Sequence, residues 1–133
     1  MEFYVEGRGR TARYVESLIP SMLEQLKMTR SRRLLHVKLD RELEDLGTTV
    51  PLDGIDTYLV VLRPMRDLSA LGATLAHELT HVSQMAKGRL KITPRGRKWN
   101  GKFYRLSYPY MQQPWEIQAF AQQEIILRRA IEL

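Results

Sequence analysis

The sequence contains no cysteine, which excludes disulfide bonds and thiolate metal sites. A metal ion in this protein would therefore be bound by histidine and carboxylate side chains. Histidine is also scarce, because the chain has three, at His36, His77 and His81. No apolar run approaches the roughly eighteen residues that a membrane-spanning helix needs. The first residues lack the basic and apolar regions of a signal peptide, so we expect a cytoplasmic protein with no membrane segment.

The composition is that of an ordinary globular protein, with 44% hydrophobic and 27% charged residues. A chain of 133 residues is long enough for one hydrophobic core, so we expect a single domain over residues 1–133. Much of the formal net charge of +6 comes from residues 8–13, 30–33 and 87–102. These basic segments are candidates for weak nucleic-acid binding, but no nucleic-acid-binding motif accompanies them, and a solvated basic surface explains them equally well. The sequence leaves the oligomeric state open.

Hydrophobic periodicity predicts an α+β domain with an N-terminal helix, a small mixed sheet and two later helices. We expect helices at residues 11–28, 67–87 and 114–131, and strands at residues 1–9 (a strand or an arm), 34–40, 57–63 and 90–93. Pro20 should kink the first helix or begin a second one. Asp53 and Gly54 indicate a turn, and residues 41–49 a loop or a short turn of helix. Residues 94–113 are basic and aromatic, and we expect an irregular loop there.

The most informative stretch is a His-Glu-x-x-His motif, formed by His77, Glu78 and His81 within the second predicted helix. Since an α-helix has 3.6 residues per turn, the two histidines lie one above the other on the same face. Two imidazoles in that arrangement can bind one metal ion, and Glu78 lies close enough to act as a general base. A suitable N-cap at Asp67 and a stop at Gly88 support the helical context. A chance pair of structural histidines is the alternative, which the rarity of the motif disfavours.

A catalytic zinc site needs a third protein ligand. Glu116 is the best candidate, because it lies in the first turn of the last predicted helix. Its face of that helix continues through Ala119, Phe120, Leu127 and Ile131, and we expect this face to pack inward, where a carboxylate needs a partner. The alternative for Glu116 is a favourable interaction with the helix dipole. His36 is a second candidate ligand, although a strand histidine more often has a structural role.

The motif at residues 77–81, followed downstream by a helix that begins Pro114-Trp115-Glu116, resembles the gluzincin branch of the zincin metallopeptidases. The small size is similar to that of the minigluzincins and of small HExxH metallopeptidase-like proteins of prokaryotes and phages. The resemblance covers roughly residues 56–125, and it implies a minimal zincin-like domain that acts on a protein or peptide substrate. It also implies that His77, His81 and Glu116 bind Zn²⁺ and that Glu78 is the general base.

The chain departs from the gluzincin pattern at Phe120, because gluzincins often have an acidic residue there that orients a metal ligand. The SprT-like relatives use a third histidine downstream of the motif. This chain has no histidine after His81, which disfavours that branch.

Peptide hydrolysis also needs a hydrogen-bond donor for the oxyanion, and Tyr108 and Tyr110 are the candidates. The alternative for these tyrosines is a role in anchoring the loop. The strand at residues 57–62 is the expected sheet edge along which an extended substrate would pair. Trp99 and Lys102 would then form the opposite rim, where they could cover the metal when no substrate is present.

The main alternative to a metallopeptidase is a catalytically silent zinc-binding scaffold that binds protein or DNA through its basic loop. The presence of Glu78 favours the enzyme, because a purely structural zinc site does not need that carboxylate. A third possibility is a protease that works while bound to nucleic acid, and its binding to DNA would depend strongly on salt.

Overall fold

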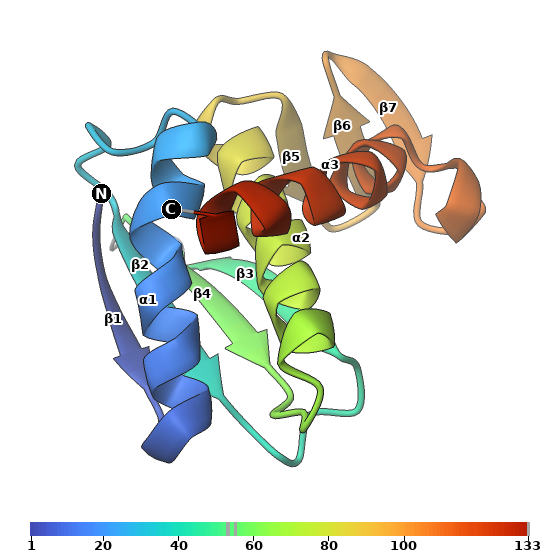
Figure 1. Ribbon diagram of the computed structural model, residues 1–133. Coiled ribbons are helices and arrows are strands. Elements are labelled where there is room, and N and C mark those ends of the chain that lie inside the picture. The colour runs from blue at the N-terminus through green and yellow to red at the C-terminus, as the bar shows by residue number, and fades with distance from the viewer. Residues whose placement is uncertain (53, 55, 133) are drawn as a thin grey trace.

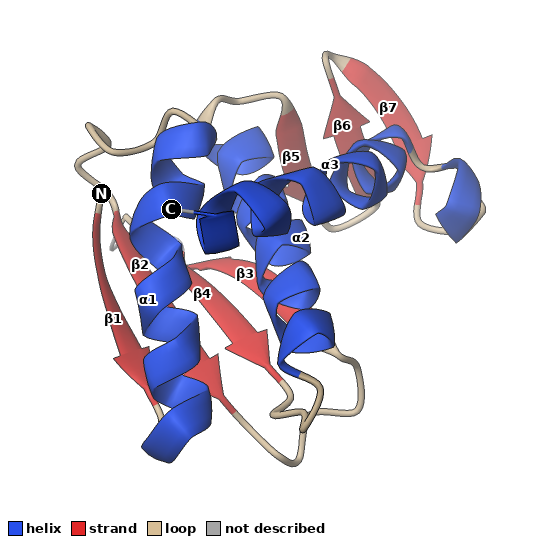
Figure 2. Ribbon diagram, viewed as in Figure 1, coloured by secondary structure: helices blue, strands red, loops and turns tan. Residues whose placement is uncertain are grey.

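The computed structural model describes residues 1–52, 54 and 56–132, and within them it confirms the predicted α+β class (Figures 1 and 2). The helices are α1 (Gly9–Gln25), α2 (Leu68–Ala86) and α3 (Pro114–Glu132), with a short 3₁₀ helix η1 (Tyr110–Gln112) before α3. The strands are β1 (Glu2–Glu6), β2 (Leu34–Leu39), β3 (Gly47–Leu52), β4 (Thr57–Leu62), β5 (Leu90–Thr93), β6 (Gly96–Trp99) and β7 (Lys102–Arg105). No described helix combines the length and the apolar character that crossing a bilayer requires.

The larger sheet has the strand order β1-β2-β4-β3, and α1 and α2 lie side by side on one of its faces (Figure 1). Strands β1, β2 and β4 are parallel, whereas β3 pairs with β4 in the antiparallel direction, so the sheet is mixed as expected. The hydrophobic core fills the space between this sheet and the helices. Its largest fully buried side chains include Ile19, Met22, Leu35, Leu62, Leu71, Leu75 and Leu79.

Helix α3 crosses over α1 and α2 on the side away from the sheet (Figure 1). Gly72 permits this close crossing, because a Cβ atom on Gly72 would lie 2.5 Å from Cδ1 of Leu127 on α3. The crossing brings the N-terminal turn of α3 over the second half of α2. It therefore positions residues that are about 40 apart in the sequence next to each other.

Two predictions about the larger sheet are wrong. We expected a loop over residues 41–49, but strand β3 begins at Gly47. The sequence did not predict this strand, because Pro51 interrupts its run of strand-forming residues. Proline cannot donate to a strand ladder and is found on edge strands, and β3 is indeed an edge. Strand β4, which we expected to be the substrate-binding edge, instead lies between β2 and β3. The free edge beside α2 belongs to β3.

The strand predicted at residues 90–93 is confirmed as β5. The irregular loop expected over residues 94–113 is wrong, because β6 and β7 lie within it and join β5 in a three-stranded antiparallel sheet. Asn100 and Gly101 form the β6–β7 turn, with φ angles of 49° and 86°. Positive φ at both central residues is typical of the type I′ turns that Asn-Gly favours, and this signal was available in the sequence. The many basic residues concealed the alternation of the two strands.

Helix α1 continues through Pro20, so this proline does not begin a second helix. Of the turn predicted at Asp53 and Gly54, Asp53 lies outside the described residues, and Gly54 has the positive φ of 86° expected of a turn glycine.

Candidate metal centre

Helix α2 presents the three motif side chains, which are all buried. Asp67 caps the helix as predicted, because its side chain accepts a hydrogen bond of 3.2 Å from the backbone N–H of Ala70. His77 and His81 lie one turn apart, and their ring centroids are separated by 4.9 Å. Both rings face the first turn of α3.

Glu116 lies in the first turn of α3, and a single carboxylate oxygen of this residue contacts both imidazole rings. Its Oε1 lies 2.9 Å from Nε2 of His77 and 2.9 Å from Nε2 of His81. These three residues form the one group of three His, Cys, Asp or Glu side chains, among the described residues, that is close enough to hold a metal ion. The three side chains that we predicted as ligands are therefore brought together by the crossing of α2 and α3.

His36, the second candidate for the third ligand, lies elsewhere. It is on β2, where it stacks on Tyr4 with a centroid distance of 4.2 Å and lies 3.1 Å from Oε1 of Glu6. Its neighbours Leu35 and Val37 are buried against the helices, so His36 points from the opposite face of the sheet.

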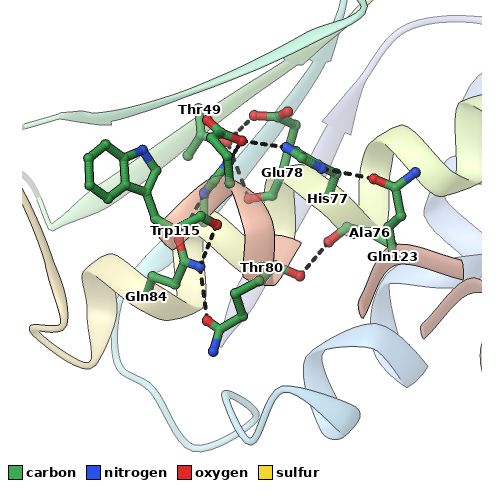
Figure 3. A network of polar contacts seen from close by, with 11 residues as sticks. Thr49, Ala76, His77, Glu78, Thr80, Gln84, Trp115 and Gln123 are labelled. Atoms are coloured by element: carbon green, nitrogen blue, oxygen red, sulfur yellow. Dashed lines mark hydrogen bonds and ion pairs between the residues drawn. The ribbon is translucent and has the colours of Figure 1, made fainter. Parts of the chain in front are cut away.

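Two glutamines that we did not predict hold the histidine rings in place. Oε1 of Gln123 lies 2.8 Å from Nδ1 of His77, and Oε1 of Gln84 lies 2.8 Å from Nδ1 of His81. Figure 3 shows Gln123 and Gln84 on different sides of the site. An amide oxygen can only accept, so each Nδ1 carries a proton, and each Nε2 points at Oε1 of Glu116. Partners of this kind are known to orient metal-binding histidines.

Phe120 takes no part in this hydrogen bonding, although it occupies the position where gluzincins often have an acidic residue. Its ring contacts the ring of His77 at a centroid distance of 4.5 Å. The inward packing that we expected for this face of α3 is confirmed for Ala119 and Leu127, which are buried. It is wrong for Phe120, which is 44% exposed, and for Ile131, which is 56% exposed. Sequence spacing offered a weak signal for Gln123, which lies two helical turns after Glu116 on the same face.

The donor set fits a cation. Two imidazole lone pairs and a carboxylate oxygen that converge at 2.9 Å repel one another unless a proton or a metal ion lies among them. Burial raises the pKa of Glu116, but the hydrogen bonds and charges of the two histidines outweigh it and lower the pKa to about 2. Burial lowers the pKa of His81, but Glu116 outweighs that effect, and the net pKa is raised. His81 therefore holds its proton to a higher pH than a free imidazole does, and a metal ion would compete with that proton for Nε2.

Comparison with known proteins gives no match. No family profile, no curated protein and no solved structure is significantly similar to this chain. The assignment of the site therefore depends on its own geometry and chemistry.

Glu78 is positioned by the edge strand. Thr49 on β3 donates a hydrogen bond of 2.8 Å to Oε1 of Glu78 (Figure 3). Gly47 lets this strand approach α2, because a Cβ atom there would lie 3.0 Å from Cγ of Glu78. Burial raises the pKa of Glu78, and the neighbouring His81, Thr49 and His77 only partly oppose this. A carboxyl group with a raised pKa is a better proton acceptor near neutral pH than an exposed one.

A cavity of about 490 Å³ opens over the histidines and Glu78. On one side it is bounded by residues 45–49 at the start of β3, and on the other by Ile92 and Arg97 of the small sheet. Phe120 and Gln123 of α3 complete its wall. This cavity lies along the free edge of β3, where an extended chain can pair with the strand.

The two candidate tyrosines are in different places. Tyr110 lines the cavity, and its hydroxyl interacts with Glu116. Burial, followed by the charge of Glu116, raises the pKa of Tyr110 to about 12, so the hydroxyl keeps its proton. Tyr108 lies outside the cavity, where its ring contacts Tyr104 at 5.0 Å.

The rim that we expected from Trp99 and Lys102 does not border the cavity. Trp99 lies between Arg89, 4.7 Å from its ring centroid, and Trp115, whose ring centroid is 6.5 Å away. The ammonium group of Lys102 lies 5.2 Å from the ring centroid of Tyr104. Other residues of the small sheet, Ile92 and Arg97, occupy the wall instead.

Proposed function

We propose that this protein is a zinc-dependent peptidase in which His77, His81 and Glu116 hold the metal. The observation that carries the proposal is the convergence of both Nε2 atoms on Oε1 of Glu116, at 2.9 Å each, within a cavity that also contains the carboxylate of Glu78. Two nitrogen ligands and one oxygen ligand, with no thiolate, are a donor set that suits catalytic zinc.

Zinc, when bound, would supply a Lewis acid that polarises the scissile carbonyl and acidifies the attacking water. Glu78 would accept the proton of that water and then deliver it to the departing amine. Its hydrogen bond from Thr49 holds the carboxylate in one orientation for both transfers. The hydroxyl of Tyr110, which lies in the same cavity, would donate to the oxyanion.

The substrate in this proposal is a peptide segment in extended conformation. The outer edge of β3, which pairs with no other described strand, borders the cavity and would bind such a segment by adding it to the sheet as a further strand. This places the substrate next to Thr49, and so within reach of Glu78.

The test compares the wild-type protein with Glu78→Gln after loading each with one equivalent of zinc. Both should bind zinc equally, because Glu78 is not a ligand, but only the wild type should cleave a mixture of unstructured peptides, as followed by mass spectrometry. Glu124→Gln, an exposed change on α3, is the matched control and should cleave like the wild type.

Two results would contradict the proposal. If the wild-type protein failed to bind zinc, the metal centre itself would be wrong. If it bound zinc but cleaved no peptide at a higher rate than Glu78→Gln, the catalytically silent scaffold would replace the peptidase.

A further inference from the structure

The positive charge of the protein is concentrated in the small sheet. Residues 87–105 contain eight Lys or Arg and no Asp or Glu. The whole chain has 21 basic and 15 acidic residues, so the rest of it carries 13 basic and 15 acidic side chains. The net charge of +6 is therefore due entirely to β5, β6, β7 and the residues just before them.

The small sheet has two unlike faces. On the inner face Leu90 is buried, and the rings of Trp99 and Tyr104 contact Trp115 of α3, with centroid distances of 6.5 Å and 5.4 Å. Side chains alternate along a strand, so the residues between these point the other way. We call that side the outer face, and it consists of Lys91, Thr93, Gly96, Lys98, Phe103 and Arg105.

The outer face carries charge that the described part of the chain does not neutralise. Lys91 lies directly opposite Lys98, and both are exposed, as is Arg105. None of the eight basic side chains of residues 87–105 forms an ion pair with a described carboxylate. Like charges directly opposite each other destabilise a sheet, so this arrangement costs stability unless an anion binds there.

An aromatic ring lies in the middle of these cations. Phe103 is the direct neighbour of Lys98 across the β6–β7 ladder, and its side chain is 48% exposed. Its ring lies over Gly96, because a Cβ atom on Gly96 would be 2.9 Å from Cζ of Phe103. A hollow of about 380 Å³ opens beside it along the edge of β7, lined by Phe103, Arg105, Tyr108 and their neighbours. One exposed ring thus lies among the cations of the outer face, with a hollow beside it.

We infer that the outer face of the small sheet binds single-stranded nucleic acid. Lys91, Lys98 and Arg105 would contact consecutive phosphates, and a base would stack on Phe103, the combination that sheet surfaces use for unpaired strands. Charge alone would serve an acidic peptide or a duplex equally well. The exposed ring of Phe103 favours a single strand, because its unpaired bases are free to stack on the ring, whereas the bases of a duplex are already stacked on each other. This inference is independent of the proposed peptidase activity.

The test measures the binding of the full-length protein to a fluorescent 20-nucleotide oligo(dT) by anisotropy over a range of salt concentrations. Lys91→Gln combined with Lys98→Gln should reduce the slope of the logarithm of the binding constant against the logarithm of the salt concentration by about 1.4 in magnitude. Each phosphate contact in a single strand contributes about 0.7 to that slope. Phe103→Leu should weaken binding about fivefold or more, and Phe103→Trp should restore it, because base stacking contributes about 1–3 kcal/mol per base.

The matched control is Arg30→Gln combined with Arg32→Gln, which removes the same charge from an exposed segment outside the small sheet. It should leave the affinity within about twofold of the wild type at physiological salt. The inference would be overturned if this control weakened binding as much as the lysine variant. It would also be overturned if duplex DNA or a polyglutamate peptide bound as tightly as oligo(dT), or if Phe103→Leu bound as well as the wild type.

Discussion

The side-chain amide of Gln84 donates a hydrogen bond of 3.0 Å to the backbone carbonyl of Trp115. The same amide presents its oxygen to Nδ1 of His81 at 2.8 Å. Trp115 precedes Glu116, so one side chain on α2 both orients the ring of His81 and holds the turn that carries Glu116. The bond to the carbonyl also determines which end of the amide faces His81, because only its NH₂ group can donate.

Gln84→Met should reduce zinc affinity about 10- to 100-fold, which is the usual effect of losing a partner of a metal ligand. Methionine keeps a similar volume but cannot accept the proton of His81. Affinity is measured by competition with a chromogenic chelator. Gln122→Met, the same substitution at a partly buried position on α3, is the control and should bind zinc like the wild type. An equal loss in both variants would contradict the orienting role.

Thr49→Val should lower kcat about tenfold or more, because a hydrogen bond to a charged group contributes about 1.5–3 kcal/mol. Zinc affinity should not change, since Thr49 bonds to Glu78 and to no ligand. Thr48→Val alters the neighbouring cavity residue without touching this bond, so its kcat should stay close to that of the wild type. Steady-state kinetics and metal titration on both variants distinguish the two effects. A parallel loss of zinc affinity in Thr49→Val would refute this explanation.

Tyr110→Phe should lower kcat by about two orders of magnitude with a smaller change in KM, as is typical when one oxyanion donor is removed. Tyr108→Phe is the matched control, because Tyr108 lies outside the metal cavity and should leave peptide cleavage unaffected. The ratio of kcat values for the two variants is the measurement. Equal rates would show that neither hydroxyl stabilises the transition state.

Gly72→Ala should destabilise the fold by up to about 2 kcal/mol, because overpacking a core costs about 1–3 kcal/mol and better helix propensity offsets about 1 kcal/mol of it. The added methyl group would lie 2.5 Å from Cδ1 of Leu127 and 3.1 Å from the hydroxyl of Tyr14. The cost of this overpacking should exceed the gain in helix propensity. Denaturant unfolding measures the change, with Ser69→Ala on the exposed side of α2 as a control within about 0.5 kcal/mol. A stabilised Gly72→Ala would mean that α3 does not require this close contact.

The sequence was sufficient for those features that depend on neighbours along the chain. The spacing of His77 and His81 is a property of any α-helix, and Asp67 caps that helix through a contact three residues away. The alternation of residues in β2 and the β-branched and aromatic residues of β4 likewise predicted two strands of the sheet. Glu116 could be selected as a third ligand because few carboxylates follow the motif. The Asn100-Gly101 pair also indicated a type I′ turn from the sequence alone, although we did not predict it.

Only the tertiary structure decided which distant residues meet. The crossing of α2 and α3 at Gly72 brings Glu116 and Gln123 of α3 to the two imidazoles, and no local pattern encodes such a crossing. The strand order made β3 rather than β4 the edge beside the site, because β3 pairs back onto β4. The turn before α3 placed Tyr110 in the cavity and Tyr108 outside it. Helix spacing and caps are short-range properties of the backbone, whereas these contacts depend on how side-chain volumes pack between elements that are far apart in the sequence.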